Sequence, residues 1–336
     1  MTLESFREYF EPIYKKEIES LLLKFSSYSP NKEIQKLINK TIDLSGGGKR
    51  IRAYVCALSY EAKNTKELSK IKNQLIAIEL LHFFALIHDD LMDNSTLRHG
   101  KKTINSYGKT EKEILKSKNE SIIMGDLIFA YSYKLFLRKN KSPKSIEVFE
   151  QLIEEVIFGQ TLDLELSQNI QHLENEVLNK MLYKTARYTF THPIQIGLIL
   201  KNEKIESNLL KKSEKFGDAL GMIFQIDDDL LDIFGDTKEL NKNTFQDIEA
   251  SQATILTSLA FKNKEFKKLL VPYLGIMPNN ESKENIKKIF IDSGAKEKSL
   301  VLKEKYIDIA NKNTIGSPKF SIIWKNLLVK ISNRTK

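Results

Sequence analysis

Two aspartate clusters with the same spacing are the residues of this chain best suited to chemistry. The first, DDLMD, runs from Asp89 to Asp93, and the second, DDLLD, runs from Asp228 to Asp232 after one more acid at Asp227. Both lie in apolar, helix-forming sequence, where residues four apart share a face. Like charges at that spacing destabilise a helix by about 0.2–0.5 kcal/mol per pair, and partial burial adds to the cost. The pattern therefore predicts a cation between the carboxylates.

The donor atoms indicate which cation this is. Carboxylate oxygens are hard ligands, and no cysteine or histidine cluster accompanies them. Such sites favour Mg²⁺, which keeps several waters and commonly bridges to substrate phosphates. Neither an HxxxH nor an HExxH spacing occurs in the chain, so zinc is not indicated. We expect a Mg²⁺ cofactor and a phosphorylated substrate.

Helical periodicity dominates the sequence that must position these acids. Strand-like alternation is not evident, and few prolines and glycines occur for this length, which favours long helices. The lysine-rich residues 279–336 keep apolar spacing and are predicted to form a C-terminal helical subregion. We expect an all-α protein with helices over 71–93, 121–137, 147–166, 177–200, 207–235 and 252–270.

Composition limits the organisation and the partners. The 336 residues are 41% hydrophobic, and no segment looks like a flexible linker, so we expect a single domain over 1–336. A lone cysteine, Cys56, excludes an internal disulfide framework and favours a reducing compartment. The N-terminus lacks the apolar core of a signal peptide, and no apolar run reaches the length of a membrane span. We therefore expect a cytoplasmic protein.

The net charge of +9 comes from lysines scattered along the chain. A nucleic-acid partner would instead favour clustered basic residues, so we do not expect one. Basic residues near the acids remain candidates for binding an anionic substrate.

Shorter motifs accompany the acidic clusters in a definite order over residues 40–260. Together with the two clusters they resemble the trans-isoprenyl diphosphate synthases, or polyprenyl synthetases, the family of the farnesyl and geranylgeranyl diphosphate synthases. A single DDxxD would be weak support; two of them with these companions are specific. The companions are Gly47-Gly48-Lys49-Arg50-Ile51-Arg52, Arg98-His99-Gly100, Gly125-Asp126, Gly159-Gln160 with Asp163, Lys184-Thr185 and Phe224-Gln225-Ile226.

The resemblance implies the isoprenoid synthase fold, an antiparallel helix bundle around a central cavity, usually as a homodimer. It implies a Mg²⁺-dependent prenyltransferase that joins isopentenyl diphosphate head-to-tail to an allylic diphosphate (dimethylallyl, geranyl or farnesyl) and releases pyrophosphate. Metal bound at both clusters would neutralise the leaving diphosphate, and apolar walls would keep water from the carbocation. The implied main metal ligands are Asp89, Asp93 and Asp228, with Asp90, Asp229 and Asp232 assisting.

The resemblance also implies substrate-binding roles. The implied ligands of isopentenyl diphosphate are Lys49, Arg52 and His82, with His99 at a position that is usually arginine. The implied ligands of the allylic diphosphate are Arg98, Lys184 and Lys242. Near the reacting carbons, where a polar group would steady the cation or the departing proton, we expect Thr185 and Gln225. On the residues alone, His82 is also compatible with an ordinary helix histidine, and His88 we interpret as structural.

The chain departs from the family pattern at several positions. His99 is mostly neutral near pH 7 unless a diphosphate raises its pKa. Ala53 stands in place of a proline, and Phe245 in place of a glycine. Two Gly-Lys pairs are replaced by Asn241-Lys242 and Ser251-Gln252. Because all the acids are present, we expect catalysis with a raised KM.

Bulk before the first cluster sets the product length in this family. Ala85 lies one turn before Asp89 and leaves room, whereas Phe84, about 100° around the helix, offers a partial floor. We therefore predict a geranylgeranyl product, with farnesyl diphosphate second.

Two alternatives from other classes stay open. A class I terpene cyclase shares the first motif, but its second metal motif normally mixes Asn, Ser or Thr with Glu. A cyclase also needs no second diphosphate site, so the pair Lys49 and Arg52 argues against it. The other alternative, a catalytically weak subunit of a heteromeric synthase, is favoured by His99 and Gln252.

Overall fold

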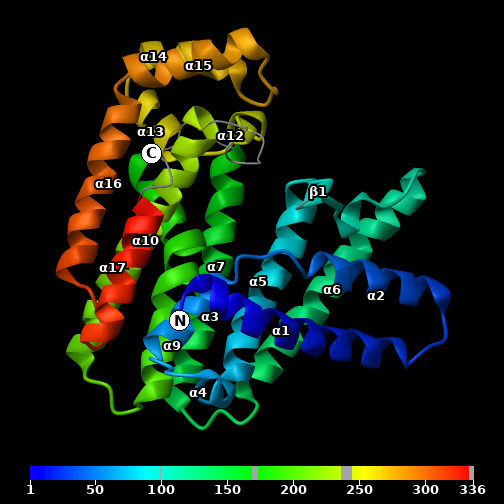
Figure 1. The fold of residues 1–336 in the computed structure, drawn as a ribbon. Coiled ribbons are helices and arrows are strands. Elements are labelled where there is room, and N and C mark those ends of the chain that lie inside the picture. The colour runs from blue at the N-terminus through cyan, green and yellow to red at the C-terminus, as the bar shows by residue number, and fades with distance from the viewer. Residues whose placement is uncertain (99, 169–172, 236–243, 333–336) are drawn as a thin grey trace. The chain divides into compact units, whose positions relative to one another are not determined.

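The computed structural model describes residues 1–98, 100–168, 173–235 and 244–332 (Figure 1). These residues form helices almost throughout, which confirms the all-α prediction. The exception is a short antiparallel hairpin of β1 (Leu97–Arg98) and β2 (Lys101–Lys102). The chain divides into two compact units, unit 1 (Met1–Ile146) and unit 2 (Glu147–Lys336).

Unit 1 is built around a pair of long helices. Gln74 and Ser132 join these helices by hydrogen bonds: the Gln74 amide donates to the Phe136 carbonyl at 2.9 Å, and the Ser132 hydroxyl donates to the Ala77 carbonyl at 2.7 Å. The paired helices are α5 (Lys72–Met92) and α6 (Glu111–Leu137). The other helices of the unit are α1 (Leu3–Ser26), α2 (Lys32–Leu44), α3 (Ile51–Ser59), α4 (Thr65–Lys70) and η1 (Ile104–Ser106).

In both units, capping residues locate the ends of helices more accurately than apolar periodicity does. The predicted helix 121–137 begins earlier, at Glu111, because Thr110 and Glu113 form a capping box in which each side chain accepts a hydrogen bond from the other's backbone N–H. The predicted helix 252–270 is in fact two helices. Its break follows from Asn263, whose side chain caps the second helix by accepting from the Glu265 N–H at 2.8 Å.

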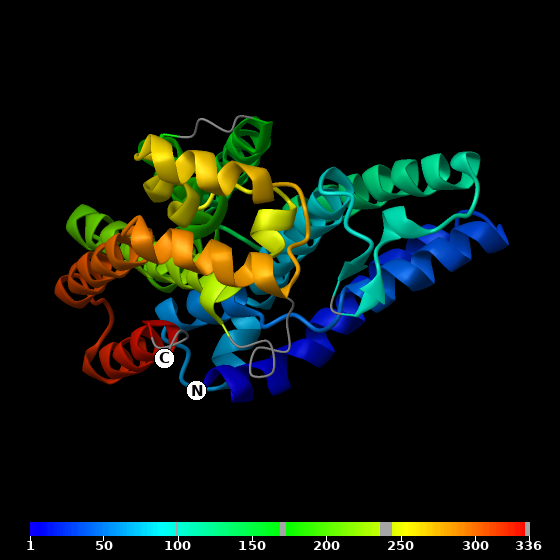
Figure 2. The ribbon, with the colours of Figure 1, turned by 90° about the horizontal axis from the view of Figure 1, so that it is seen from above.

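Unit 2 is centred on the long helix α10 (Ser207–Phe234), which carries the second acidic cluster. α16 and α17 pack along it, and α13, α14 and α15 gather at one end of the unit (Figures 1 and 2). The remaining bounds are α7 (Pro143–Gln168, whose first turn precedes the division), α8 (Glu174–Lys180), η2 (Met181–Thr191), α9 (His192–Lys201), α12 (Gln246–Glu249), α13 (Ile255–Phe261), α14 (Lys264–Leu270), η3 (Val271–Tyr273), α15 (Asn280–Asp292), α16 (Ala295–Lys312) and α17 (Pro318–Ser332).

One predicted helix of unit 2 has an unexpected interior. The predicted helix 177–200 corresponds to α8, η2 and α9 in succession, and η2 is a π-helix. π-Helical turns are rare and occur frequently at functional sites. Lys184 and Thr185, two of the predicted site residues, lie in this wide segment.

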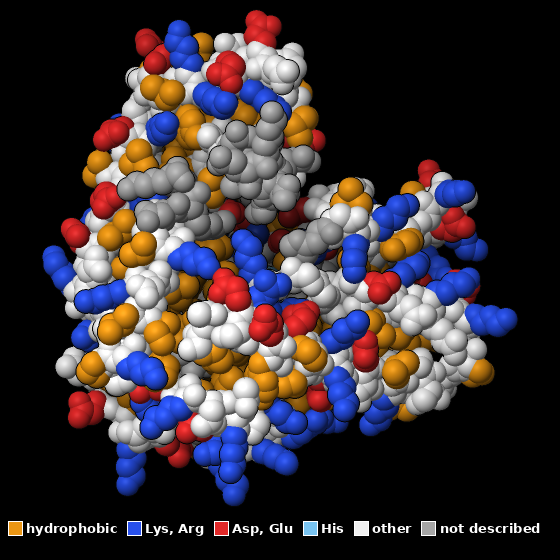
Figure 3. All heavy atoms as spheres, viewed as in Figure 1, with side chains coloured by type: hydrophobic (Ala, Val, Ile, Leu, Met, Phe, Trp, Pro, Cys, Tyr) orange, Lys and Arg blue, Asp and Glu red, His pale blue; other side chains and the backbone are white. Residues whose placement is uncertain are grey.

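Surface and core agree with the compositional predictions. Cys56 is fully buried and free, as expected for a small core residue. On the face shown in Figure 3, Lys and Arg side chains are spread among Asp and Glu. Within the described ranges, no helix is long and apolar enough to cross a lipid bilayer.

The acid that precedes the second cluster has a structural role. The Asp227 carboxylate is fully buried and accepts a 2.5 Å hydrogen bond from Lys303 of α16, whose side chain is 5% exposed. Neighbouring residues lie about 100° apart around a helix, so Asp227 faces α16 while the acids that follow it face elsewhere. This buried pair fixes the rotation of α10 against α16.

We predict that Lys303→Met lowers the free energy of unfolding by about 3–5 kcal/mol, since it leaves a buried carboxylate without its cation. Urea unfolding followed by circular dichroism measures the loss. Adding Asp227→Asn should restore most of it. A K303M protein as stable as the wild type would contradict the assigned role.

Candidate active site

The first acidic cluster lies in the last turn of α5, in unit 1. Asp90 is buried and forms a two-pronged ion pair with Arg98 of β1: Nε lies 2.8 Å from Oδ2, and Nη2 lies 2.8 Å from Oδ1. Asp89 is half-buried and Asp93 is exposed. Burial opposes the charge on Arg98, but the carboxylates of this cluster outweigh it and raise the pKa of the guanidinium. Arg98 thus orients the cluster and balances its charge.

The other predicted site residues of unit 1 lie on α3, on α5 and in the loop before α3. Lys49 is exposed and Arg52 is half-buried, on either side of the buried Arg50. His82 is half-buried on α5, two turns before Asp89, and residues seven apart share a helical face.

The predicted product-length residues also lie on α5. Phe84 is half-buried, and its ring centroid lies 5.0 Å from that of Phe129 on α6 and 4.7 Å from that of His88. His88 also has its Nε2 3.3 Å from the Ile122 carbonyl oxygen, a contact that fits the structural role we gave it. The Phe84 and Phe129 rings are therefore in contact between α5 and α6, and the sequence indicated one of the two. Ala85 is half-buried beside it.

The second cluster lies near the end of α10, in unit 2. Asp229 is buried and accepts hydrogen bonds from the Gln225 amide at 2.8 Å and from the Ile255 N–H, at the start of α13, at 2.9 Å. Burial raises the pKa of Asp229 to about 6, although both hydrogen bonds favour the charged form. Asp228 is half-buried beside it.

Asp232 organises the backbone that follows α10. Its carboxylate accepts from the Gln246 and Asp247 N–H groups at 3.0 and 3.1 Å, and its carbonyl accepts from the Phe245 N–H at 2.8 Å. Burial and the carboxylates of Asp232 and Asp229 raise the pKa of Asp247. Asp247 is thus a further acid of this cluster. Helical spacing gave no signal for Asp247, because it lies beyond the end of α10.

The turn held by Asp232 has an unusual backbone. Phe245 and Ser251 occupy positions where the family pattern has glycine, and their φ angles are 64° and 54°. This left-handed region costs a residue with a Cβ about 1–2 kcal/mol. The chain therefore keeps a conformation suited to glycine, and the Phe245 ring compensates by packing in the core.

The polar residues of η2 connect to both neighbouring helices. The Thr185 hydroxyl donates to the Gln225 amide oxygen at 2.8 Å, which continues the hydrogen bonds from Gln225 to Asp229. Lys184 forms an ion pair with the buried Asp163 of α7, which also pairs with Lys180 at 3.0 Å. Gly159 is required nearby, because a Cβ there would lie 2.4 Å from the Lys184 backbone nitrogen. The structure therefore connects Thr185 and Gln225 to the second cluster, whereas Lys184, the neighbour of Thr185 in η2, pairs with Asp163.

Two of the departures from the family pattern, His99 and Asn241, lie outside the described residues, as does the predicted ligand Lys242. Gln252 is half-buried, and its N–H donates to the Asp247 carbonyl at 2.7 Å.

The donor chemistry fits a hard cation. All six predicted ligands are carboxylates; Asp90 and Asp229 are buried and held by protein donors, whereas Asp89, Asp93 and Asp228 keep contact with solvent. Across the described part of the chain, no three acidic, cysteine or histidine side chains form a ready-made metal cage. Such open carboxylate pairs suit Mg²⁺, which usually takes one or two carboxylates plus substrate phosphates.

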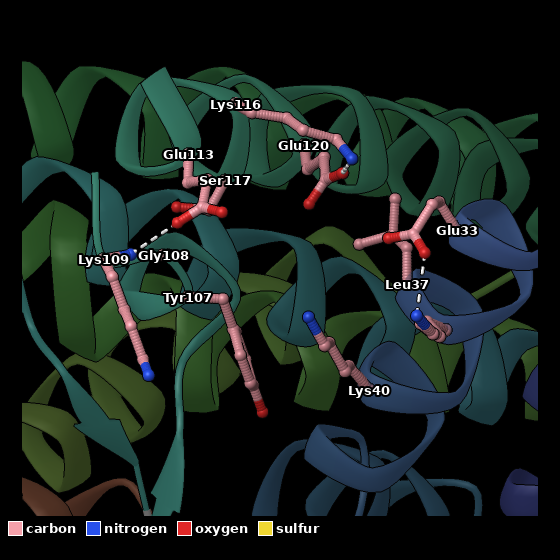
Figure 4. A pocket seen from close by; sticks show the side chains of 11 residues that line it. Glu33, Leu37, Lys40, Tyr107, Gly108, Lys109, Glu113, Lys116, Ser117 and Glu120 are labelled. Carbon is pink, nitrogen blue, oxygen red and sulfur yellow. Dashed lines mark hydrogen bonds and ion pairs between the residues drawn. The ribbon is translucent and has the colours of Figure 1, made fainter. Parts of the chain in front are cut away.

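A separate charged groove lies in unit 1, between α2 and the first turns of α6. It has a volume of about 520 Å³, and none of the described site residues lines it (Figure 4). Its carboxylates have partners on their own helices: Glu33 pairs with Lys36 at 2.8 Å, and Glu120 pairs with Lys116 at 3.5 Å. Four lysines and three glutamates line this groove, and its carboxylates are already engaged by neighbouring lysines or backbone N–H groups, so it does not compete with the acidic clusters as a candidate active site.

Known proteins are similar to this chain in sequence and in fold. The polyprenyl synthetase family model matches residues 31–292. A short chain isoprenyl diphosphate synthase of Methanocaldococcus jannaschii is 33% identical over 69% of this chain and 68% of its own length. A geranylgeranyl diphosphate synthase of Saccharolobus solfataricus is 31% identical over 80% of each chain.

Two further similarities concern product class and fold. Heptaprenyl diphosphate synthase component 2 of Bacillus subtilis is 30% identical over 80% of this chain and 73% of its own length. A crystal structure of geranylgeranyl pyrophosphate synthase from Corynebacterium glutamicum, complexed with isoprenyl diphosphate and magnesium, matches 99% of this chain and 100% of its own with a TM-score of 0.86. At 20% identity, that likeness establishes the isoprenoid synthase fold alone.

We predict that Asp163→Asn lowers the free energy of unfolding at pH 7 by about 3 kcal/mol, since two partly buried lysines lose their shared carboxylate. Burial by itself would raise the pKa of Asp163, but Lys180 and Lys184 outweigh it and hold that pKa below its usual value. The stability that Asp163 contributes is therefore present above its unfolded pKa and lost as pH falls through its folded pKa.

Urea unfolding at a series of pH values tests this. The difference between the wild type and D163N should shrink at acid pH, and a difference independent of pH would contradict the pairing.

Proposed function

The chain belongs to the polyprenyl synthetase family of isoprenyl diphosphate synthases, and on that premise we propose that it condenses isopentenyl diphosphate head-to-tail with an allylic diphosphate. Pyrophosphate is released. The observation that carries the proposal is the pair of carboxylate clusters, in each of which one acid is buried and held by protein donors while others keep contact with solvent. We also propose that residues 1–336 act as one catalytic domain.

We propose Mg²⁺ as the cofactor, with Asp89 and Asp93 as ligands at the first cluster and Asp228 as a ligand at the second. Asp90, Asp229 and Asp232 assist by orienting these ligands, since outer carboxylates fix the geometry of inner ones. When bound, the metal supplies charge neutralisation at the leaving diphosphate.

The remaining proposed roles, substrate binding and orientation, belong to side chains of the protein. In this proposal Lys49, Arg52 and His82 bind isopentenyl diphosphate, and Lys184 takes the allylic diphosphate by exchanging its contact with Asp163. Arg98, beside the first cluster, assists in binding the allylic diphosphate. Lys242, for the allylic diphosphate, and His99, for isopentenyl diphosphate, are proposed from the family pattern alone. Thr185 and Gln225, joined by a hydrogen bond, orient polar oxygen atoms toward the reacting carbons.

We propose a homodimer on one further observation. α6 exposes several large apolar side chains, an arrangement typical of a surface covered by another chain. They are Ile114, Leu115, Ile122 and Ile123.

The proposed function predicts that purified protein turns over isopentenyl diphosphate with at least one of dimethylallyl, geranyl and farnesyl diphosphate when Mg²⁺ is present. A chelator should abolish turnover and Mg²⁺ should restore it. Asp89→Asn and Asp228→Asn should each lower kcat/KM by about 100-fold or more, because losing an outer carboxylate alone costs 10–100-fold.

Asp308 on α16 is exposed, so Asp308→Asn is the matched control and should have wild-type activity. Conversion of the allylic substrate without isopentenyl diphosphate would indicate a cyclase instead. No activity with any primer would indicate a non-catalytic subunit of a larger synthase. The relative named heptaprenyl diphosphate synthase component 2 makes this alternative worth testing.

We propose geranylgeranyl diphosphate as the main product, although the relatives include a heptaprenyl synthase component as well as geranylgeranyl synthases. We propose that the half-buried rings of Phe84 and Phe129, which are in contact between α5 and α6, form a barrier to chain growth beside Ala85. Farnesyl diphosphate is the second candidate.

We predict that Phe84→Ala lengthens the product, because it removes one ring of this barrier. Chromatography of the dephosphorylated products measures chain length. Phe83→Ala is the matched control: Phe83 is a buried core residue, so its loss should lower stability without changing the product. Unchanged products with F84A would exclude the barrier.

A further inference from the structure

Arg50, in the middle of the motif Lys49-Arg50-Ile51-Arg52, is turned into the protein. Its side chain is 4% exposed, and it donates to both carboxylate oxygens of Glu11 on α1, from Nε at 2.7 Å and from Nη2 at 2.9 Å. Nη2 also donates to the Ser45 carbonyl at 2.8 Å, and the guanidinium carbon lies 4.0 Å from the centre of the Tyr14 ring. The guanidinium is therefore occupied by protein groups and is a poor ligand for a substrate.

The glycine-rich loop lies directly against this guanidinium. A Cβ added at Gly48 would be 3.1 Å from Nη1 of Arg50, a tighter contact than nine in ten real Cβ atoms make, and Gly47 has a φ of 85°. Arg50 itself has a φ of 56°, a left-handed conformation that reverses the backbone between Lys49 and α3. The loop therefore takes its shape from two glycines that let the backbone cover the Arg50 side chain.

A second carboxylate connects this arrangement to α3. Glu79 of α5 lies 3.6 Å from Nη1 of Arg50 and accepts a 3.0 Å hydrogen bond from the Ala53 N–H in the first turn of α3. An anion at a helix N-terminus stabilises that end. The position of Arg52, one residue before Ala53, is thereby set by the same buried charges that hold the loop.

We propose that Arg50 is a positioning residue, anchored by Glu11, on which the loop carrying Lys49 folds so that Lys49 and Arg52 bind isopentenyl diphosphate. This inference rests on the proposed function and extends it to a residue that touches no substrate. Removing the anchor should loosen the loop and weaken the binding of one substrate, with the chemical step and the other substrate unaffected.

The structure offers a matched pair of variants for the test. Glu11 and Glu17 are both on α1, and each accepts hydrogen bonds from an arginine: Glu17 from Arg138 at 3.2 Å and from the Tyr131 hydroxyl at 2.7 Å. Of the two arginines, only Arg50, which is bound by Glu11, lies against the glycine-rich loop. Glu11→Gln and Glu17→Gln therefore remove the same charge from the same helix.

We expect E11Q to raise the KM for isopentenyl diphosphate about tenfold, which corresponds to the loss of one good contact, with kcat and the allylic KM within about twofold of the wild type. E17Q should leave all three constants unchanged. Arg50→Lys, which keeps the charge but lacks the fork that grips Glu11, should reproduce the E11Q effect. An unchanged KM for isopentenyl diphosphate, or equal losses for both substrates, would overturn the proposal.

Amide hydrogen exchange of the peptide that spans Gly46 to Lys49 gives a second readout that needs no activity. It should accelerate in E11Q and R50K but not in E17Q. If the wild type shows no condensation, the proposed function fails, while unchanged exchange in E11Q would by itself refute the role of Arg50.

Discussion

The cost of placing several carboxylates in apolar helices is the constraint on which the rest of the structure depends. A buried carboxylate is tolerated only with hydrogen bonds or a counter-charge. Each buried acid of the two motifs has such partners: Asp90 has Arg98, Asp227 has Lys303, and Asp229 has donors from α10 and α13. These partners fix the local geometry of each cluster, so that the remaining carboxylates are presented to solvent, where a cation can reach them.

The same principle extends to the basic residues. Lys184 shares the buried Asp163 with Lys180, and Arg50 lies between Glu11 and Glu79. Each basic motif therefore contains a charge whose partners are within the protein. In the proposed function a basic residue near the anion site either binds the substrate or holds the residues that do, and Arg50 has the second role because Glu11, Glu79 and the Ser45 carbonyl occupy its guanidinium. Residue type alone does not distinguish the two roles.

Much of the fold was predictable because it follows from local patterns. Long apolar periodicity located α5 and α10 nearly to the residue, and few glycines and prolines excluded a β architecture. The errors have physical reasons. Polar capping residues such as Thr110 and Asn263 extend or divide a helix without changing apolar periodicity, and apolar periodicity does not distinguish the π-helical stretch of η2 from an α-helix.

For this protein the sequence by itself determined the family: paired aspartates one helical turn apart occur with basic and glycine-rich motifs in a specific order. The tertiary structure decided which partner each of several similar residues contacts. Neighbouring acids such as Asp227 and Asp229 differ because a helix turns each toward a different partner, and the adjacent Lys49 and Arg50 differ because a left-handed turn directs one inward. Such differences depend on contacts between residues distant in the chain, which spacing along one helix does not contain.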